Sequence, residues 1–265
     1  MVTVGLTNHA KREESGIIKF TMNSETFHIT IAGDSAINLV FADEITPGTS
    51  TLIRQAAQML SEEEIPGVVE LVPTFCSLMV CYNPLVIGYD DLCARIQGKL
   101  DGLSAGASRT HRVFSIPVCY GGDFGPDLPT VAEHAGLSEQ EVIAIHSQPD
   151  YLIDMLGFLP GFAYLGGLDP RLVTPRLAVP RTIIPAGSVG IGGAQTGVYP
   201  LDSPGGWQLI GRTPVRPYDP DREKPILYEA GDYLRFVPID EDAYRAIEAK
   251  IKTGEYDYVV TIEEA

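Results

Sequence analysis

The feature that most constrains this chain is a 50-residue segment, 157–206, that is rich in glycine and proline and almost free of charge. It holds 11 of the 27 glycines and 7 of the 20 prolines, but only five charged side chains. Glycine and proline at this density interrupt both helices and long strands. The segment therefore predicts short strands joined by elaborate loops, as in a compact barrel-like β domain.

Regular elements flank this segment on both sides. Ser138 and Glu141 form a capping box for a short helix that ends near His146, and YLIDML at 151–156 follows it as a strand. The remaining patterns of this half predict two further β-runs, a terminal helix and an edge strand or tail, at 207–214, 232–239, 240–254 and 255–265.

The first half of the chain alternates between strand and helix patterns. Apolar residues at period two in TFHITIAGDSAINLVFAD predict two strands around a Gly33-Asp34 turn, and Thr46 followed by Pro47 predicts the start of a helix. Two strands, a second helix and a last strand follow, at 67–73, 77–84, 92–100 and 111–118. This order of elements is typical of a small α+β sandwich of the split βαβ kind.

A small and polar stretch, DGLSAGASRT at 101–110, separates the two halves and predicts a linker or loose loop. We therefore expect two domains within an α+β fold. The first covers 1–110, with an N-terminal extension at 1–25. The second covers 111–265, with the helix and tail at 240–265 as its C-terminal part.

Charge and composition exclude several kinds of partner. The net charge of −16 and a pI near 4.6 oppose binding to nucleic acid or to an anionic membrane, because both would repel the chain. The N-terminus lacks the plan of a signal peptide, and no apolar run reaches 18 residues. The four cysteines form no C-x-x-C pair. These features predict a cytoplasmic protein with reduced thiols and no metal site.

The segment 157–206 contains no His, Cys, Lys or Glu, so a site built there could orient and desolvate a ligand but has few groups that move protons. The chain also lacks a Walker A loop and H-E-x-x-H. The polar groups available there suit a small polar or anionic ligand, with arginine as a carboxylate clamp. They are Tyr164, Arg176, Arg181, Gln195, Thr196 and Tyr199. In the alternative interpretation the glycines serve turns, the aromatics fill the core and the arginines are solvated.

Two residues outside this polar set have more than one interpretation. His146 lies at the end of the capped helix, so it either interacts with the helix dipole or transfers protons. Trp207, the only tryptophan, follows two glycines and either packs in the core or forms the wall of a pocket.

Residues 145–214, which include GFLPGFAYLGGLDPRLVTPRLAVPRT and GSVGIGGAQTGVYPLDSPGGWQ, closely resemble the family that contains the 5-oxoprolinase B subunit, the kinase inhibitor KipI and allophanate hydrolase subunit 1. IPVCYGGDFGPDL at 116–128 and GDSAINLVF at 33–41 match as well, so the resemblance covers about 33–238. Ala163 and Gly192-Gly193-Ala194 depart from the family pattern. An alanine at 194 would be strained if the backbone there required a positive φ.

The resemblance implies a small ferredoxin-like N-terminal domain followed by a cyclophilin-like β-barrel domain. It also implies one component of an ATP-hydrolysing enzyme, 5-oxoprolinase, which works with the C and A subunits to open 5-oxo-L-proline to L-glutamate, with ATP as co-substrate and Mg²⁺ bound to the ATP. Phosphorylation of the lactam oxygen would create the leaving group. The predicted catalytic residue is His146. The predicted substrate-binding residues are Phe162, Tyr164, Arg176, Arg181, Gln195, Thr196, Tyr199 and Trp207.

Two alternatives to this enzyme function remain open at the level of sequence. A KipI-like member would dock onto a sensor histidine kinase and inhibit it, and the acidic surface would then act by docking. A member of the urea or allophanate pathway would take part in biotin-linked carboxyl transfer. The barrel alone does not decide between these functions, because one fold supports many.

Overall fold

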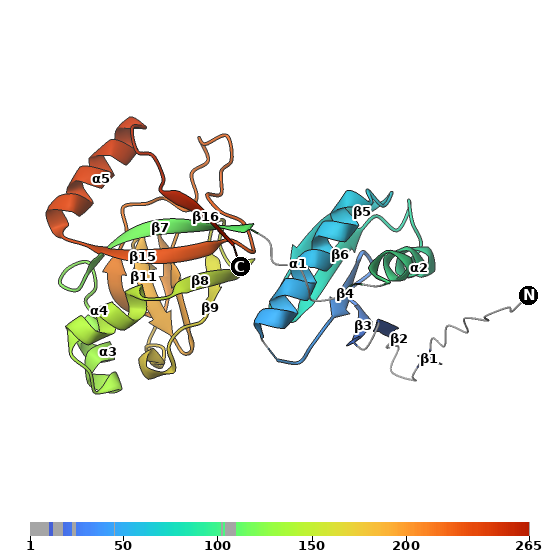
Figure 1. Cartoon of the computed structure of the whole chain (residues 1–265), viewed down its shortest axis with the longest axis horizontal. Coiled ribbons are helices and arrows are strands. Elements are labelled where there is room, and N and C mark those ends of the chain that lie inside the picture. The colour runs from blue at the N-terminus through green and yellow to red at the C-terminus, as the bar shows by residue number, and fades with distance from the viewer. Residues whose placement is uncertain are drawn as a thin grey trace, which may run out of the picture. The chain divides into compact units, whose positions relative to one another are not determined.

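The computed structural model describes residues 11–12, 18–22, 25–44, 46–101, 103 and 110–264. The chain divides into two compact units, Met1–Ala107 and Ser108–Ala265, and this division lies within a few residues of the predicted one (Figure 1). Most of the predicted linker at 101–110 and of the predicted extension at 1–25 lies outside the described residues.

The first unit is an antiparallel sheet with two helices. Helix α1 packs against β5, β6 and α2, and the sheet order is β1-β2-β3-β4-β6-β5. Its elements are β1 (Lys11–Arg12), β2 (Ile18–Met22), β3 (Glu25–Ile31), β4 (Ala36–Val40), α1 (Pro47–Glu62), β5 (Val68–Pro73), β6 (Ser77–Tyr82) and α2 (Tyr89–Leu100).

Local signals in the sequence set these elements. The hydroxyl of Thr46 accepts a hydrogen bond from the Thr49 N–H at 3.1 Å and caps α1, as predicted. Gly33 takes a φ of +73° in the turn between β3 and β4. Phe27 and Ile29 of β3 are fully buried, because period-two alternation turns them toward the helices.

One part of the predicted topology is wrong. The split βαβ order counts the strand predicted at 111–118 in the small sheet, whereas the predicted boundary at 110 assigns it to the second domain; in the structure it is a strand of the second unit. In the first unit, β3 lies beside β4 and precedes it in the chain. The order β3-β4-β6-β5 is that of a ferredoxin-like sheet in which the outer strand comes before the first βαβ unit instead of after the second helix. Strand patterns do not show which sheet a strand joins.

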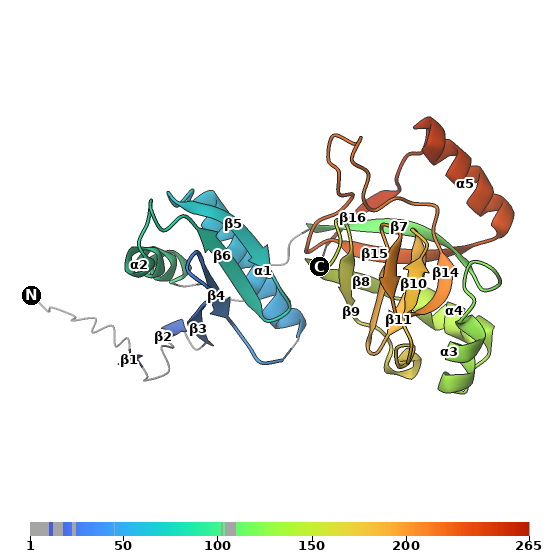
Figure 2. The same ribbon diagram turned by 180° about the vertical axis from the view of Figure 1, so that it is seen from behind.

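The second unit is a closed barrel of seven strands. The sheet order is β14-β11-β12-β9-β8-β15-β7-β16, and pairing of β14 with β7 closes it (Figure 2). Its elements are β7 (Thr110–Tyr120), α3 (Leu128–Ala135), α4 (Glu139–Ser147), β8 (Asp150–Leu156), β9 (Ala163–Gly166), η1 (Pro170–Leu172), β10 (Arg181–Ile184), β11 (Ser188–Gly192), β12 (Gln195–Val198), β13 (Ser203–Gly205), β14 (Gln208–Arg212), β15 (Tyr233–Ile239), α5 (Glu241–Thr253) and β16 (Val260–Glu264).

Strand β7 has eleven residues and is long enough to pair with three neighbouring strands. One edge pairs in parallel with β15; the other pairs with β16 near its start and with β14 at its end, where Arg212 opposes Cys119. The edge strand predicted in the tail is therefore confirmed as β16. The predicted fold class, α+β with a barrel as second domain, is confirmed as well.

Helices α3 and α4 pack against strands of the barrel, and they bury Val131 and Val142 in its core. The capping box of α4 is present, because Ser138 Oγ accepts the Glu141 N–H and the Glu141 carboxylate accepts the Ser138 N–H at 2.8 Å. The hydrogen bond that the carboxylate accepts from the Ser138 N–H holds the pKa of Glu141 below its ordinary value. Helix α3 was not predicted, since its eight residues follow a glycine- and proline-rich turn.

The glycine run GSVGIGG is a barrel strand, not a phosphate-binding loop. Every residue of β11 is buried, and the strand pairs with β12 on one side and β14 on the other. The positive φ of the β11–β12 hairpin falls on Gly193 at +66° and not on Ala194. Alanine at position 194 is therefore compatible with the loop.

Candidate functional site

The glycine-rich segment forms a pocket of about 370 Å³ on the second unit, here called the aromatic pocket. Its walls come from the turn before β9, the loop before β10, and the stretch from β12 to β14. The lining residues are Phe158, Phe162, Tyr164, Arg176, Leu177, Pro180, Tyr199, Pro204, Gly205, Gly206 and Trp207.

Phe162 is the centre of the aromatic cluster under this pocket. Its ring packs edge-to-face with Tyr164, Tyr199 and Trp207 at centroid distances of 5.1, 5.5 and 5.6 Å. These rings belong to a small hydrophobic cluster separate from the barrel core. Trp207 is only 5% exposed yet lines the pocket, so it serves both as core and as pocket wall. Edge-to-face packing fixes the rings without help from charged groups.

Glycine is needed here because the backbone approaches the rings closely. A Cβ at Gly192 would lie 2.2 Å from the Trp207 indole, and a Cβ at Gly205 would lie 2.7 Å from the Tyr199 hydroxyl. Any larger residue would push the ring that it meets out of place. The glycines of the segment thus make room for large aromatic side chains.

Arg176 supplies the charge of the aromatic pocket. Its guanidinium lies over the Trp207 ring at 5.9 Å from the centroid, and no ion pair with a described carboxylate holds it. A guanidinium placed in this way over an aromatic face can bind a carboxylate in a bidentate manner. Burial raises the pKa of the neighbouring Tyr199 to about 12, so this phenol stays a neutral hydrogen-bonding group.

Phe158 forms the exposed rim of the pocket under backbone strain. Its φ is +66°, a left-handed conformation that phenylalanine rarely adopts, and its side chain is 63% exposed. Val179 and Ile183, in and after the loop that carries Pro180, are 81% and 66% exposed. Strain and exposed apolar side chains that gather near one pocket are typical of a binding face.

Arg181 supports the pocket from behind. Its Nη2 donates to Asp127 Oδ1 at 2.7 Å and its Nη1 donates to the Trp207 carbonyl at 3.3 Å. Asp127 Oδ2 also accepts the Leu209 N–H at 2.6 Å. Asp127 was not among the predicted site residues, although it lies in the matched motif GPDL and could have been found there.

His146 lies in the barrel core and not in the aromatic pocket. It is fully buried; Nδ1 contacts the Tyr120 hydroxyl at 2.8 Å, and Nε2 contacts Thr196 Oγ1 at 2.7 Å. Thr196 donates its own proton to the Gly190 carbonyl at 3.0 Å, so it must accept from Nε2–H, and Nδ1 must accept from Tyr120. Burial lowers the pKa of His146 to about 3. The ring is thus neutral and has no exposed atom with which to reach a substrate.

The structure brings together five of the eight predicted substrate-binding residues. Phe162, Tyr164, Arg176, Tyr199 and Trp207 line the aromatic pocket. Three residues lie elsewhere: Arg181 is behind the wall, Thr196 is in the core beside His146, and Gln195 begins β12 opposite Gly192. The sequence indicated the segment but not which of its side chains point outward. Phe158 and Leu177 line the pocket and were missed for the same reason.

Neither a metal-binding cluster nor a membrane-spanning helix is found among the described residues. No group of three or more His, Cys, Asp or Glu side chains in this part of the chain could hold a metal ion. No described helix combines the length and the apolar composition that a membrane span requires.

Comparison with known proteins gives one consistent family. The model of the family described as carboxyltransferase domain, subdomain C and D, matches residues 27–228. The chain is 42% identical over 230 residues to the 5-oxoprolinase B subunit of Bacillus subtilis (strain 168), with 83% of this chain and 96% of that protein covered. It is 46% identical over 212 residues to the 5-oxoprolinase B subunit of Escherichia coli O157:H7, with 80% and 95% covered.

A solved structure extends the likeness of fold to a larger protein. The K. lactis urea amidolyase superposes with a TM-score of 0.77 at 20% identity, over 93% of this chain and 17% of that one. At this identity the likeness concerns the fold alone. The chain therefore belongs to the carboxyltransferase domain, subdomain C and D family, and within it to the 5-oxoprolinase B subunits.

Proposed function

We propose that this chain is the B subunit of an ATP-dependent 5-oxoprolinase, which opens 5-oxo-L-proline to L-glutamate together with the A and C subunits of the enzyme. Its similarity to two proteins named as 5-oxoprolinase B subunits, over nearly their whole length, carries the proposal. The aromatic pocket supports it independently, because its shape and chemistry suit a small cyclic carboxylate.

The substrate has an apolar face, a carboxylate and a lactam, and the pocket offers a partner for each. The rings of Phe162 and Trp207 form an apolar wall for the five-membered ring. The Arg176 guanidinium is placed for the carboxylate, and the neutral Tyr199 phenol is available for the lactam. A volume of about 370 Å³ is in the range of small-molecule sites.

The pocket itself lacks a group to drive the chemistry. Its lining has no His, Lys, Asp or Glu, so it holds no general base and no ligand for a metal. A lactam resists hydrolysis, and phosphorylation of its oxygen by ATP would supply the leaving group. We therefore propose that residues of a partner protein in the complex bind ATP with Mg²⁺, and that the site is completed where this partner covers Phe158, Val179 and Ile183. We also propose that the enzyme is located in the cytoplasm.

The direct test is reconstitution. The purified chain is mixed with the A and C subunits, 5-oxoproline and ATP, and glutamate is measured. Glutamate should form only with all three proteins, and Arg176→Met should raise the KM for 5-oxoproline tenfold or more, because a charge-assisted contact is lost. Arg216→Met, which removes an exposed arginine outside the pocket, is the matched control. No glutamate from the complete mixture would refute the proposal.

A further inference from the structure

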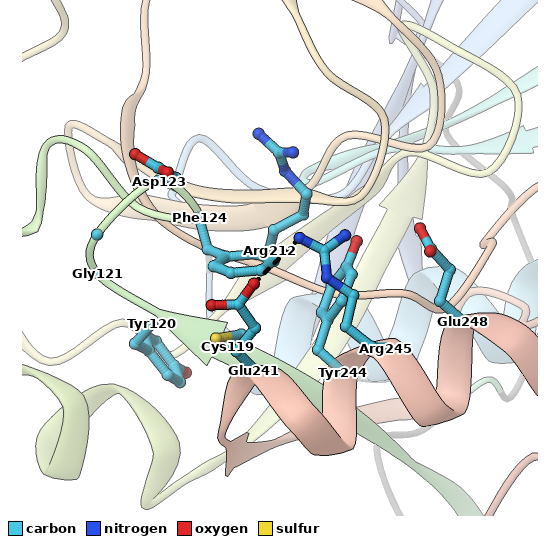
Figure 3. A pocket seen from close by; sticks show the side chains of 11 residues that line it. Cys119, Tyr120, Gly121, Asp123, Phe124, Arg212, Glu241, Tyr244, Arg245 and Glu248 are labelled. Carbon is cyan, nitrogen blue, oxygen red and sulfur yellow. Dashed lines mark hydrogen bonds and ion pairs between the residues drawn. The ribbon is translucent and has the colours of Figure 1, made fainter.

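A second pocket, of about 340 Å³, lies where β7 ends at Tyr120, beside the turn that follows it and helix α5 (Figure 3). It is here called the arginine pocket. It shares no lining residue with the aromatic pocket. The lining residues are Cys119, Tyr120, Gly121, Gly122, Asp123, Phe124, Arg212, Glu241, Tyr244, Arg245 and Glu248.

Arg212 is the unusual residue of this pocket. It ends β14, and pairing with Cys119 of β7 and Ser188 of β11 fixes its backbone. Its Nε is buried and has no hydrogen-bond partner among the described residues, and no described carboxylate forms an ion pair with it. The chain has 35 acidic and only 19 basic Lys and Arg side chains, so an arginine left without a carboxylate is not explained by a shortage of acids. A buried, unsatisfied guanidinium N–H costs free energy unless a ligand or water accepts it.

Two of the three acidic residues of this pocket already have partners. Glu241 binds Arg245 at 3.1 Å and Glu248 binds Lys252 at 2.9 Å, each one helical turn away on α5. Both carboxylates are therefore compensated by their own helix. Asp123, the third acidic residue, forms no ion pair with a described residue, and the Arg212 guanidinium points away from the Glu241–Arg245 pair in Figure 3.

The remaining groups form a preorganised frame beside Arg212. The Arg245 guanidinium lies 5.6 Å from the centroid of Phe124 and 5.8 Å from that of Tyr244. Tyr244 is 6% exposed and extends along Arg245 in Figure 3. Two guanidinium groups and a nearly buried phenol thus border one cavity and offer N–H and O–H donors to it.

We propose that the arginine pocket binds the oxyanion of a small ligand, a carboxylate or a phosphate, and that Arg212 is its principal contact. A planar guanidinium with a free Nε–H and Nη–H pair binds such a group through two parallel hydrogen bonds. The bound anion satisfies the buried Nε and balances the charge of Arg212. This site is independent of the proposed 5-oxoprolinase function, since it involves none of the aromatic pocket residues.

The test observes the Nε–H of Arg212 directly by NMR of the full chain labelled with ¹⁵N-arginine. Sodium phosphate and sodium L-glutamate are titrated separately at constant ionic strength, with chloride as the reference anion. We expect a saturable shift of one Nε–H resonance, which is assigned by its loss in Arg212→Met. Whichever anion gives the shift identifies the ligand class as phosphate or carboxylate.

Variants separate this site from other sources of the signal. Arg212→Met should weaken binding, measured by calorimetry, about tenfold or more. Lys224→Met, which removes an exposed cation outside both pockets, should leave binding unchanged. If neither anion gives a saturable shift in the wild-type chain, or if the shift persists in Arg212→Met, the proposal is wrong. If Arg212→Met fails to fold, Arg212→Lys, which keeps the charge but has no Nε–H, provides the assignment.

Discussion

Asp127 Oδ1 accepts a hydrogen bond from Arg181 Nη2 at 2.7 Å, and this pair joins the start of α3 to the wall of the aromatic pocket. Arg181 Nη1 also donates to the Trp207 carbonyl, and Asp127 Oδ2 accepts a hydrogen bond from the Leu209 N–H. Neither residue lines the pocket. A partly buried pair of this kind holds the backbone of Trp207 from behind the pocket wall.

The first prediction concerns this pair. Asp127→Asn keeps an acceptor for one donor but removes the charge that holds Arg181, so the unfolding free energy should fall by about 2–4 kcal/mol. The KM for 5-oxoproline should rise because Trp207 is less well fixed. Urea denaturation and steady-state kinetics measure the two effects. Glu133→Gln, an exposed change on the same helix, should alter neither. Equal effects from both variants would refute the positioning role.

The second prediction uses Trp207 as its own reporter, since it is the only tryptophan. Gly192→Ala places a Cβ 2.2 Å from the indole and should displace it. We expect a red-shifted fluorescence maximum and a loss of about 1–3 kcal/mol of stability, which is usual for overpacking. Gly98→Ala in α2, where a Cβ meets no atom within 4 Å, should leave the fluorescence unchanged and slightly stabilise its helix. An unshifted spectrum in Gly192→Ala would contradict the close approach described above.

The third prediction follows from the burial of His146, which lowers its pKa from 6.5 to about 3. Between these two values the unfolded chain binds the proton and the folded chain does not. Stability should therefore fall as the pH drops from 6.5 toward 3, with a contribution of about 1.4 kcal/mol per pH unit from this residue. Above pH 6.5 this contribution is constant.

Chemical denaturation at a series of pH values measures this slope. His146→Gln should flatten it, whatever the variant does to stability at neutral pH. His134→Gln, at an exposed position on α3, should keep the wild-type slope. If the two variants give the same slope, His146 is not the group responsible.

The fourth prediction separates strain from function at Phe158. Phe158→Gly relieves the positive φ, whereas Phe158→Ala keeps it, so the glycine variant should be more stable than the alanine variant by about 1 kcal/mol. Both variants lose the exposed ring at the rim of the pocket, so both should reduce glutamate formation in the reconstituted assay. Thermal unfolding and the assay together check this. A strained residue that can be replaced without loss of activity would show that the strain serves no function.

Much of the fold could be predicted because local chemistry decides it. The Thr46 cap, the Ser138 capping box and the period-two strand at Phe27 each depend on residues a few positions apart. The placement of β7 could not be predicted in this way, since its partners β14, β15 and β16 lie about 90 to 150 residues later in the chain. Sheet membership of a strand depends on such distant pairings.

The candidate site, too, could be predicted only in part from the sequence. Composition indicated the segment that carries the pocket, because its glycines and aromatics are needed together. It could not show that Thr196 points into the barrel toward His146 while Tyr199, three residues later, lines the pocket. The orientation of each side chain depends on the register of β12 with β9 and β11, which only the three-dimensional structure gives.

The pairing of β7 with β15 has a consequence for synthesis on the ribosome. β7 ends at Tyr120, whereas β15, which pairs in parallel with β7 and lies between β7 and β8 in the sheet, ends only at Ile239. At about 5–20 residues per second, the first strand of the barrel waits on the order of 10 s for this neighbour to be translated. During this interval the edge of β7 that pairs with β15 has no partner in the nascent domain. A chaperone that covers this strand would act at the stage when aggregation is most favoured.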